Sequence, residues 1–172
     1  TVVTQNVTVQ LNAAGTASVT AAQVNNGSTD NTSNASMSVA PNTFTCANIG
    51  ANTVTLTVND VNGNSATGTA TVTVVDSILP TITAPANIVT TTDTDCTATS
   101  ITLGAPTTTD NCSVASVTNN APATYPVGTT TVTWTVTDGS GNIKTATQTV
   151  TVNDVTLPTI TAPANVIVSA NN

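Results

Sequence analysis

The stretch TTTVTWTVTDGSGN, residues 129–142, decides the fold of this chain. Val132, Trp134 and Val136 alternate with threonines, and a period of two in β-branched residues is typical of a strand with one buried face and one wet face. The run ends in Asp, Gly, Ser and Asn, which favour tight turns, and a second alternating run follows at residues 145–152. We therefore predict a β-hairpin whose tip carries oxygen ligands.

The same hairpin occurs 78 residues earlier. Residues 54–64 match residues 132–142 in their alternating apolar positions and in the Asp, Gly and Asn of the turn. The segment TITAPAN occurs at residues 81–87 and again at 159–165. A period of this length is that of a domain and is much longer than a solenoid repeat. The sequence predicts three parts: a first repeat at 1–77, a second at 78–155, and the start of a truncated third repeat at 156–172.

About seven short alternating runs fit into each repeat, and frequent turn signals separate them. No segment combines a period of 3.6 with good helix formers, so no helix is expected. Short strands at this spacing are typical of a β-sandwich. The predicted fold class is all-β, with immunoglobulin-like β-sandwiches in tandem.

The composition excludes several classes of function. The chain has 172 residues, one Lys or Arg, no His and a net charge of −7. No basic patch can be built for nucleic acid or for an anionic membrane surface. No apolar run reaches the length of a membrane span. The uncharged polar composition favours a secreted, extracellular repeat, and since no signal peptide is visible we expect a part of a longer chain.

Two of the three cysteines, Cys96 and Cys112, lie in the second repeat. A disulfide between them would close a loop of about 15 residues and contribute about 3 kcal/mol to stability. The alternative is two buried free thiols. We predict the Cys96–Cys112 bond, which leaves Cys46 either buried or paired with another chain.

Acidic residues recur at matched places in the repeats. Six of the eight acids form the pairs Asp30 and Asp110, Asp60 and Asp138, and Asp76 and Asp154. One interpretation is turn capping, since Asp bonds its own backbone in turns. The other is a Ca²⁺ site, because Ca²⁺ takes six to eight oxygen ligands. The candidate ligands are these six Asp together with Asn31, Asn62, Asn64, Asn111 and Asn142.

An immunoglobulin-like fold would bring the hairpin tip of one domain to the place where the preceding linker arrives. Asp76 would then approach Asp138 and Asn142, and Asp110 and Asn111 would join them from a neighbouring loop. Three clustered carboxylates repel one another without a cation. A Cys96–Cys112 bond conflicts with this arrangement, because it pulls Asp110 toward the opposite end of the domain.

Four segments of the second repeat resemble the hyalin-repeat (HYR) domain: PTITAP at 80–85, DNC at 110–112, YPVGTTTVTW at 125–134 and TDGSGN at 137–142. The resemblance covers almost all of the second repeat, while the first departs at its start. It implies an immunoglobulin-like sandwich found in tandem in extracellular adhesion proteins. Two positions that are often Cys in the family read Ala84 and Ala146 here, whereas Cys96 and Cys112 look like the family's other pair.

The Thr-, Asn- and Val-rich tandem style resembles very large Bacteroidetes surface adhesins, including gliding-motility adhesins exported by type IX secretion. This implies a structural stalk or spacer in a surface adhesin or filament. The alternatives are a carbohydrate- or protein-binding module, for which Tyr125 is the one candidate exposed aromatic, and an accessory domain of a secreted enzyme. Expected partners are neighbouring repeats, surface polysaccharide, other surface proteins or copies of itself. Catalysis is not expected, because without His or Glu the acid–base work falls to Asp alone.

Overall fold

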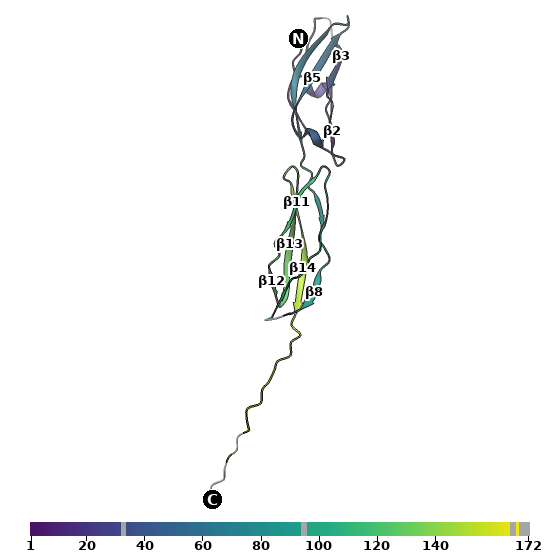
Figure 1. Ribbon diagram of the computed structural model, residues 1–172. Helices are drawn as coiled ribbons and strands as arrows, with labels where there is room; N and C mark the ends of the chain where they lie inside the picture. The colour runs from purple at the N-terminus through teal and green to yellow at the C-terminus, as the bar shows by residue number, and fades with distance from the viewer. Residues whose placement is uncertain (32–33, 94–95, 166–167, 169–172) are drawn as a thin grey trace.

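The computed structural model describes residues 1–31, 34–93, 96–165 and 168. Figure 1 shows two elongated β units joined end to end, followed by an extended C-terminal segment. We call strands β1–β6 the N-terminal sandwich and strands β7–β14 the C-terminal sandwich. The predicted all-β class with immunoglobulin-like sandwiches in tandem is confirmed.

The N-terminal sandwich packs a four-stranded sheet, in the order β1-β6-β5-β3, against the pair β2-β4. Its elements are β1 (Val7–Gln10), β2 (Thr16–Ser18), α1 (Ala21–Val24), β3 (Asn34–Ala40), β4 (Thr43–Thr45), the 3₁₀ turn η1 (Cys46–Asn48), β5 (Gly50–Asp60) and β6 (Ser65–Val75).

The C-terminal sandwich repeats this plan. Its four-stranded sheet has the order β11-β13-β14-β8, and two further pairs, β12-β9 and β10-β7, complete it. The strands are β7 (Thr81–Thr83), β8 (Ile88–Thr91), β9 (Thr97–Thr99), β10 (Thr107–Thr109), β11 (Val114–Asn119), β12 (Thr124–Pro126), β13 (Gly128–Asp138) and β14 (Ile143–Asn153). In both sandwiches the long hairpin is antiparallel and a short strand joins its outer edge in parallel.

Alternation along the long hairpins builds both cores. Val132 and Val136 are fully buried and Trp134 nearly so, while the threonines between them face outward. All three aromatic residues of the chain, Phe44, Tyr125 and Trp134, lie inside a core. Tyr125 is only 2% exposed, and burial raises the pKa of its hydroxyl. The prediction of an exposed aromatic at this position is therefore wrong.

The expectation of a chain without helices is also wrong in one place. Strand β2 ends at Ser18, and a single helical turn, α1, follows it. Thr20 starts this turn as a capping box: its hydroxyl accepts the N–H of Gln23, and its own N–H donates to the Gln23 side chain at 2.8 Å. The reciprocal cap satisfies two backbone donors and so stabilises a turn that propensity alone disfavours.

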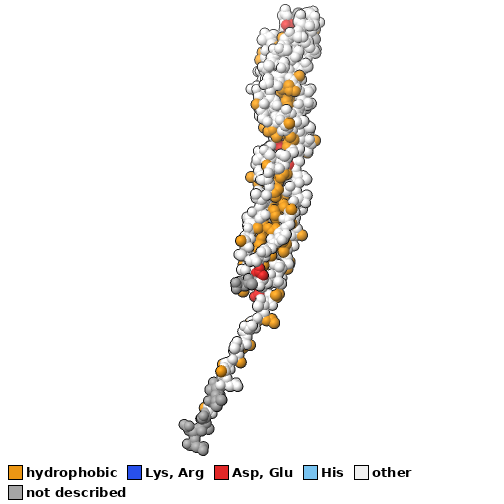
Figure 2. All heavy atoms as spheres, in the orientation of Figure 1, with side chains coloured by type: hydrophobic (Ala, Val, Ile, Leu, Met, Phe, Trp, Pro, Cys, Tyr) orange, Lys and Arg blue, Asp and Glu red, His pale blue; other side chains and the backbone are white. Residues whose placement is uncertain are grey.

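The described part of the C-terminal segment, residues 154–165 and 168, contains no strand. Its apolar side chains at Leu157 and Ile160 are more than four-fifths exposed. The division of the chain at 77/78 and 155/156, and the assignment of 156–172 to a third repeat, stay predictions. No helix in the described ranges is both long and apolar enough to cross a membrane. On the face shown in Figure 2 hydrophobic side chains are scattered over both sandwiches, a few acidic side chains are visible and no Lys is seen.

Candidate functional site at the junction of the two sandwiches

Three carboxylates meet where the sandwiches join. Asp76 follows β6 in the linker, Asp110 precedes β11, and Asp138 ends β13 at the hairpin tip. One oxygen from each lies within 4.8 Å of the others. Asp76 and Asp138 are buried, at 8% and 2% exposure, and Asp110 is partly buried. The structure thus brings together three of the carboxylates named as candidate ligands.

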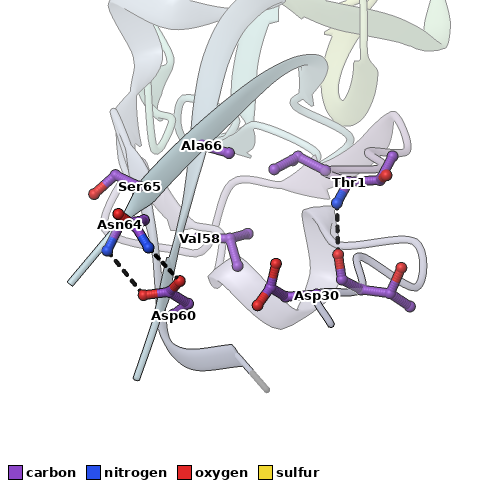
Figure 3. A pocket seen from close by; sticks show the side chains of 9 residues that line it. Thr1, Asp30, Val58, Asp60, Asn64, Ser65 and Ala66 are labelled. Carbon is purple, nitrogen blue, oxygen red and sulfur yellow. Dashed lines mark hydrogen bonds between the residues drawn. The ribbon is translucent and has the colours of Figure 1, made fainter. Parts of the chain in front are cut away.

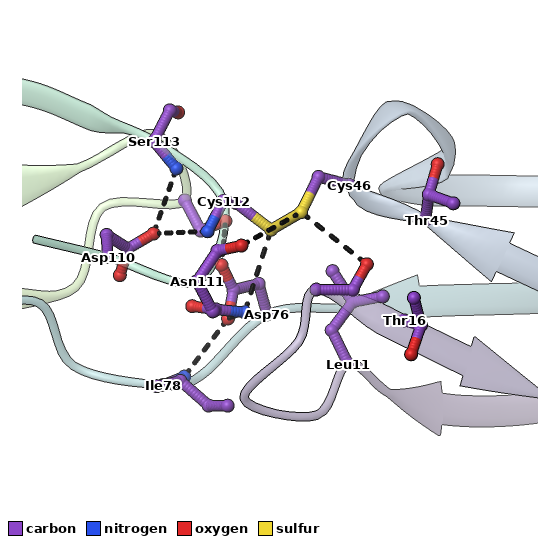
Figure 4. The surroundings of a disulfide bond; sticks show 12 residues. Leu11, Thr16, Thr45, Cys46, Asp76, Ile78, Asp110, Asn111, Cys112 and Ser113 are labelled. Carbon is purple, nitrogen blue, oxygen red and sulfur yellow. Dashed lines mark hydrogen bonds between the residues drawn. A yellow bond between two sulfur atoms is a disulfide. The ribbon is translucent and has the colours of Figure 1, made fainter.

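Each carboxylate also caps its own turn. Asp138 Oδ1 accepts the backbone N–H groups of Ser140 and Asn142 at 2.9 and 2.7 Å. Asp110 Oδ2 accepts those of Cys112 and Ser113 at 2.8 and 2.9 Å (Figure 4). Turn capping, one of the two interpretations left open, is thus present at the junction. It does not use every oxygen.

Two buried oxygens at the junction are left over. Asp110 Oδ1 and Asn111 Oδ1 have no hydrogen-bond partner among the described residues, although both atoms are shielded from solvent. An unpaired buried acceptor costs about 1–3 kcal/mol, and more when it is charged. The site thus holds three carboxylates and one amide oxygen. Two of its acceptor atoms, Asp110 Oδ1 and Asn111 Oδ1, have no donor among the described residues. This all-oxygen donor set is of the kind that Ca²⁺ prefers.

Two side chains connect the linker to the hairpin tip. Asn142 donates its side-chain N–H to Asp138 Oδ2 at 2.7 Å and to the backbone oxygen of Asp76 at 3.2 Å. Ser140 donates its hydroxyl to Asp76 Oδ2 at 3.4 Å. The sequence analysis missed Ser140. It lies in the turn between Gly139 and Gly141, two residues after the capping Asp138.

The electrostatics of Asp138 favour its charged form. Burial by itself raises the pKa of this carboxyl, but hydrogen bonds from the Asn142 side chain and from the backbone of Asn142, Ser140 and Gly141 outweigh it and hold the pKa below the ordinary value. The single Lys or Arg of the chain is Lys144, which is exposed on β14. The protein thus has almost no cationic side chain with which to balance its acids.

A disulfide crosses the junction beside these acids. Cys46 of the N-terminal sandwich is bonded to Cys112 of the C-terminal sandwich, with a Cα–Cα distance of 5.5 Å (Figure 4). Next to it, Asn111 donates its side-chain N–H to the backbone oxygen of Asn12 and to Asp76 Oδ1, both at 3.3 Å. Both half-cystines pack against the core of the N-terminal sandwich.

The predicted Cys96–Cys112 disulfide is wrong, and Cys96 is an exposed free thiol. Cys96 lies just before β9. Strand β9 pairs with β12, which leads into the start of β13, so Cys96 lies near the first residues of β13. Cys112 lies near Asp138, at the other end of β13. The eleven residues of β13 separate these ends by roughly 35 Å. A disulfide requires Cα atoms within about 7 Å. The conflict between this bond and the acidic cluster is thereby resolved in favour of the cluster.

A second set of candidate ligands lies at the opposite end of the N-terminal sandwich. Asp30, Asp60 and Asn64 line a pocket of about 90 Å³ together with Thr1 (Figure 3). Asp60 Oδ2 accepts a hydrogen bond from the side-chain N–H of Asn64 at 2.7 Å. This bond, and a second one from the backbone N–H of Asn64, lower the pKa of Asp60. This turn is a copy of the Asp138 turn.

The remaining candidate ligands lie outside the junction cluster. Asn31 and Asn62 are exposed near the Asp30 and Asp60 end, and the backbone N–H of Asn62 donates to Asp60 Oδ1 at 2.8 Å. Asp154 is exposed at the start of the C-terminal segment and caps Thr156 at 2.8 Å. The structure therefore brings together five of the eleven predicted ligands: Asp76, Asp110, Asn111, Asp138 and Asn142.

Comparison with known sequences identifies a similarity in the C-terminal sandwich. The sequence model of the HYR domain matches residues 75–152, so the C-terminal sandwich is similar to this family. No match was found among curated proteins.

Three solved structures resemble the chain at low identity. Fibronectin(III)-like modules of Clostridium thermocellum CbhA are 14% identical with a TM-score of 0.36, and the match covers 95% of this chain and 96% of that one. Protocadherin Gamma B7 extracellular cadherin domains 1–4 are 12% identical with a TM-score of 0.36, covering 89% and 51%. Human mucin-like protocadherin EC1–2 is 14% identical with a TM-score of 0.33, covering 90% and 98%. The chain thus spans about half the length of the protocadherin Gamma B7 structure.

Proposed function

We propose that the chain is a stalk segment of an extracellular surface adhesin or filament, in which a Ca²⁺ ion and a disulfide fix one sandwich to the next. The observation that carries the proposal is the junction itself. A covalent bond and a cluster of three carboxylates coincide at the point where the two sandwiches meet. A flexible tether between independent domains needs neither feature, whereas a segment that transmits force or holds a distance needs both domains in a fixed orientation.

The residues present fit a Ca²⁺ ion. Asp76, Asp110 and Asp138 would supply carboxylate oxygens, and the unpaired oxygen of Asn111 would supply an amide ligand. When bound, the cation offsets the repulsion among three carboxylates that the protein does not neutralise itself. Because these ligands come from the linker and from two loops of the C-terminal sandwich, binding would fix the path of the linker.

The setting in which such a stalk would work is extracellular. A chain with an inter-domain disulfide suits an oxidising compartment. The HYR match and the low-charge, Thr- and Asn-rich surface support the same placement. We extend the proposal to a Bacteroidetes adhesin of the gliding-motility type exported by type IX secretion, on the resemblance in repeat style alone. The partners of such an adhesin would be neighbouring repeats, surface polysaccharide, another surface protein or copies of itself. The proposal assigns no catalytic activity to the chain.

Carbohydrate binding is the weaker alternative. Glycan sites commonly present aromatic faces, and the three aromatic residues are all buried in the cores. No observation on the described surface favours it over a spacer role.

Calorimetric titration of Ca²⁺ into chelator-treated protein tests the proposal. We expect heat of binding and a higher melting temperature with Ca²⁺, because an ion that binds only the folded state stabilises it. Asp110→Asn should abolish most of the binding, whereas Asp154→Asn, which changes an acid outside the cluster, should leave it unchanged. Absence of both the heat and the thermal shift in the native chain would remove Ca²⁺ from the proposal. Equal loss in both variants would indicate nonspecific binding to acids.

A further inference from the structure

The disulfide and the acidic cluster at the junction share one short loop. Asp110 and Asn111, two of the proposed Ca²⁺ ligands, immediately precede Cys112, which is bonded to Cys46. We propose that this bond sets the Ca²⁺ affinity of the junction, and that Ca²⁺ in turn protects the bond from reduction. The inference rests on the proposed function and adds to it a regulation of the same site by the redox state of the two cysteines.

The carboxylates of the cluster belong to two separate bodies. Asp76 directly follows Val75, the last residue of β6, so its position is set by the N-terminal sandwich. Asp110, in the loop before β11, and Asp138, at the end of β13, belong to the C-terminal sandwich. Movement of one sandwich relative to the other therefore changes the distance of Asp76 from the other two carboxylates.

The loop that carries Asp110 is itself fixed to the N-terminal sandwich. The backbone N–H groups of Cys112 and Ser113 donate to Asp110 Oδ2 at 2.8 and 2.9 Å and close the loop into a tight turn (Figure 4). Cys112 packs against the N-terminal core, and its bonded partner Cys46 is the first residue of η1 in that sandwich. The disulfide thus holds the turn of Asp110 against the body from which Asp76 emerges.

The side chain of Asn111 depends on the same contact between the sandwiches. Its amide group donates to the backbone oxygen of Asn12, in the N-terminal sandwich, and to Asp76 Oδ1, both at 3.3 Å. Cys46 Sγ lies 3.6 Å from the backbone oxygen of Asn111. These contacts use the nitrogen end of the amide, and its buried oxygen is left without a donor among the described residues. Loss of the disulfide would release the contact with Asn12 and with it the fixed orientation of this amide.

A preformed site binds a cation more tightly than a site that the cation must assemble. With the disulfide intact, the loop and the linker are held together before the ion arrives, so binding does not have to overcome the entropy of ordering them. Without the bond, repulsion among the three carboxylates favours their separation. We expect the oxidised junction to bind Ca²⁺ about tenfold more tightly than the reduced one, a factor that is usual for two coupled sites.

Thermodynamic linkage makes the effect reciprocal. If the disulfide tightens Ca²⁺ binding by a given factor, Ca²⁺ raises the equilibrium constant of disulfide formation by the same factor. The reductant is a small-molecule thiol such as glutathione. In the exchange the S–S bond of the protein breaks, the S–H hydrogens of two glutathione molecules pass to the two cysteines, and one molecule of glutathione disulfide forms.

The coupling gives the junction two states. In a reducing compartment with little Ca²⁺ the thiols stay reduced and the carboxylates stay apart. In an oxidising compartment that contains Ca²⁺ each event favours the other, so the bond and the ion fix the two sandwiches in one cooperative step.

Calorimetric titration of Ca²⁺ into disulfide variants is the first test. Cys46→Ala removes the bond and leaves every proposed ligand in place, so the dissociation constant should rise about tenfold. Cys96→Ala, which removes the exposed free thiol outside the junction, is the matched control and should bind like the native chain. Equal dissociation constants in the three proteins would overturn the proposal.

A second measurement keeps both junction cysteines and does not depend on the folding of Cys46→Ala. In Cys96→Ala only the Cys46–Cys112 pair can exchange with glutathione. After equilibration in a glutathione buffer and alkylation of free thiols, mass spectrometry gives the ratio of oxidised to reduced chain. With saturating Ca²⁺ this ratio should be about tenfold higher than with chelator. A disulfide that supports only the fold would give the same ratio in both conditions, and that result would overturn the proposal.

Asp138→Asn in the Cys96→Ala background is the ligand control. It removes one carboxylate of the cluster at the hairpin tip and leaves both cysteines and the Asp110 turn unchanged, so the effect of Ca²⁺ on the redox ratio should largely disappear. An undiminished effect in this variant would place the ion outside the cluster and overturn the proposal.

The outcomes separate this inference from the proposed function. Heat of Ca²⁺ binding in the native chain that Cys46→Ala does not weaken, together with an unchanged redox ratio, would overturn the coupling and leave the Ca²⁺ site standing. Absence of heat in the native chain, together with an unchanged redox ratio, would remove Ca²⁺ from the proposed function and overturn the coupling with it.

Discussion

Cys46 and Cys112 lie 66 residues apart in the sequence and covalently join two sandwiches that share no strand pairing in the described parts of the chain. Beside the bond, Asn111 reaches the backbone of Asn12, and Cys112 packs against the N-terminal core. The relative orientation of the two sandwiches therefore depends on the contacts at this junction.

Removing the disulfide should loosen the junction without unfolding either sandwich. In Cys46→Ala no strand is changed and only a partly buried side chain at the edge of the N-terminal core is shortened, so far-ultraviolet circular dichroism should stay native. Small-angle X-ray scattering should then report a wider distribution of distances between the sandwiches, widest when Ca²⁺ is chelated. Cys96→Ala is the matched control and should scatter like the native chain. An unchanged distribution in Cys46→Ala under chelation would show that the bond contributes nothing to rigidity.

Gly15→Ala should damage the junction more than the loss of a glycine alone explains. Its Cβ would lie 2.7 Å from a backbone oxygen of the other sandwich, closer than real contacts allow. Gly27 is the matched control, because it has φ +80° and nothing lies within 4 Å of an added Cβ. Both variants should lose about 1–2 kcal/mol of stability to left-handed strain. Only Gly15→Ala should also slow formation of the Cys46–Cys112 bond during oxidative refolding, and equal rates would contradict the clash.

Stability at low pH should depend on Asp138. Its pKa is lower in the folded protein than the ordinary value of 3.8. A depressed carboxyl contributes stability that is present above the unfolded pKa and is lost as the pH falls through the folded pKa. In calcium-free buffer the melting temperature should therefore fall from about pH 4 downward, and less steeply in Asp138→Asn than in the native chain. Asp154→Asn should keep the native slope, and a parallel slope in Asp138→Asn would refute this assignment.

Gln148→Ala should be one of the most destabilising substitutions in the C-terminal sandwich. This fully buried side chain accepts the Trp134 indole N–H at 3.1 Å and donates to the backbone oxygens of Ala86 and Leu103 at 2.7 and 3.0 Å. Truncation leaves the buried Trp134 N–H and two partly buried backbone oxygens without this partner, and we expect a loss of about 3 kcal/mol in chemical denaturation. Gln5→Ala, which removes one exposed bond to Gln23, should cost less than about 1 kcal/mol. Similar losses in the two variants would show that the buried bonds of Gln148 do not stabilise the core.

Gln148 also marks a limit of the sequence argument. The alternation of residues 145–152 places Gln148 among the inward-facing positions. A polar residue at such a position does not by itself show that its side chain is buried. In the N-terminal sandwich the same pair of positions is filled by Leu56 and Ala70, both buried and apolar. The Trp134 and Gln148 pair can replace them because two backbone oxygens from loops distant in sequence, those of Ala86 and Leu103, accept hydrogen bonds from Gln148, which no local pattern encodes.

The cysteines show the same limit. Proximity in sequence favoured Cys96 and Cys112, but an eleven-residue strand separates them. One signal in the sequence was not used. None of the three cysteines is matched by a cysteine at the equivalent position of the other repeat. This pattern is expected when a disulfide forms between repeats. The acids were better predicted, since turns fix the place of Asp138 and the linker fixes that of Asp76.

The sequence by itself determined the sheets, the side chains that fill their cores, and the repetition of one sandwich plan, because strand alternation and turn chemistry are local properties. The tertiary structure alone decided which cysteine meets which and which oxygens stay unpaired. Those outcomes depend on how closely loops from two separate sandwiches approach one another. At Gly15 the approach is possible because this residue has no side chain.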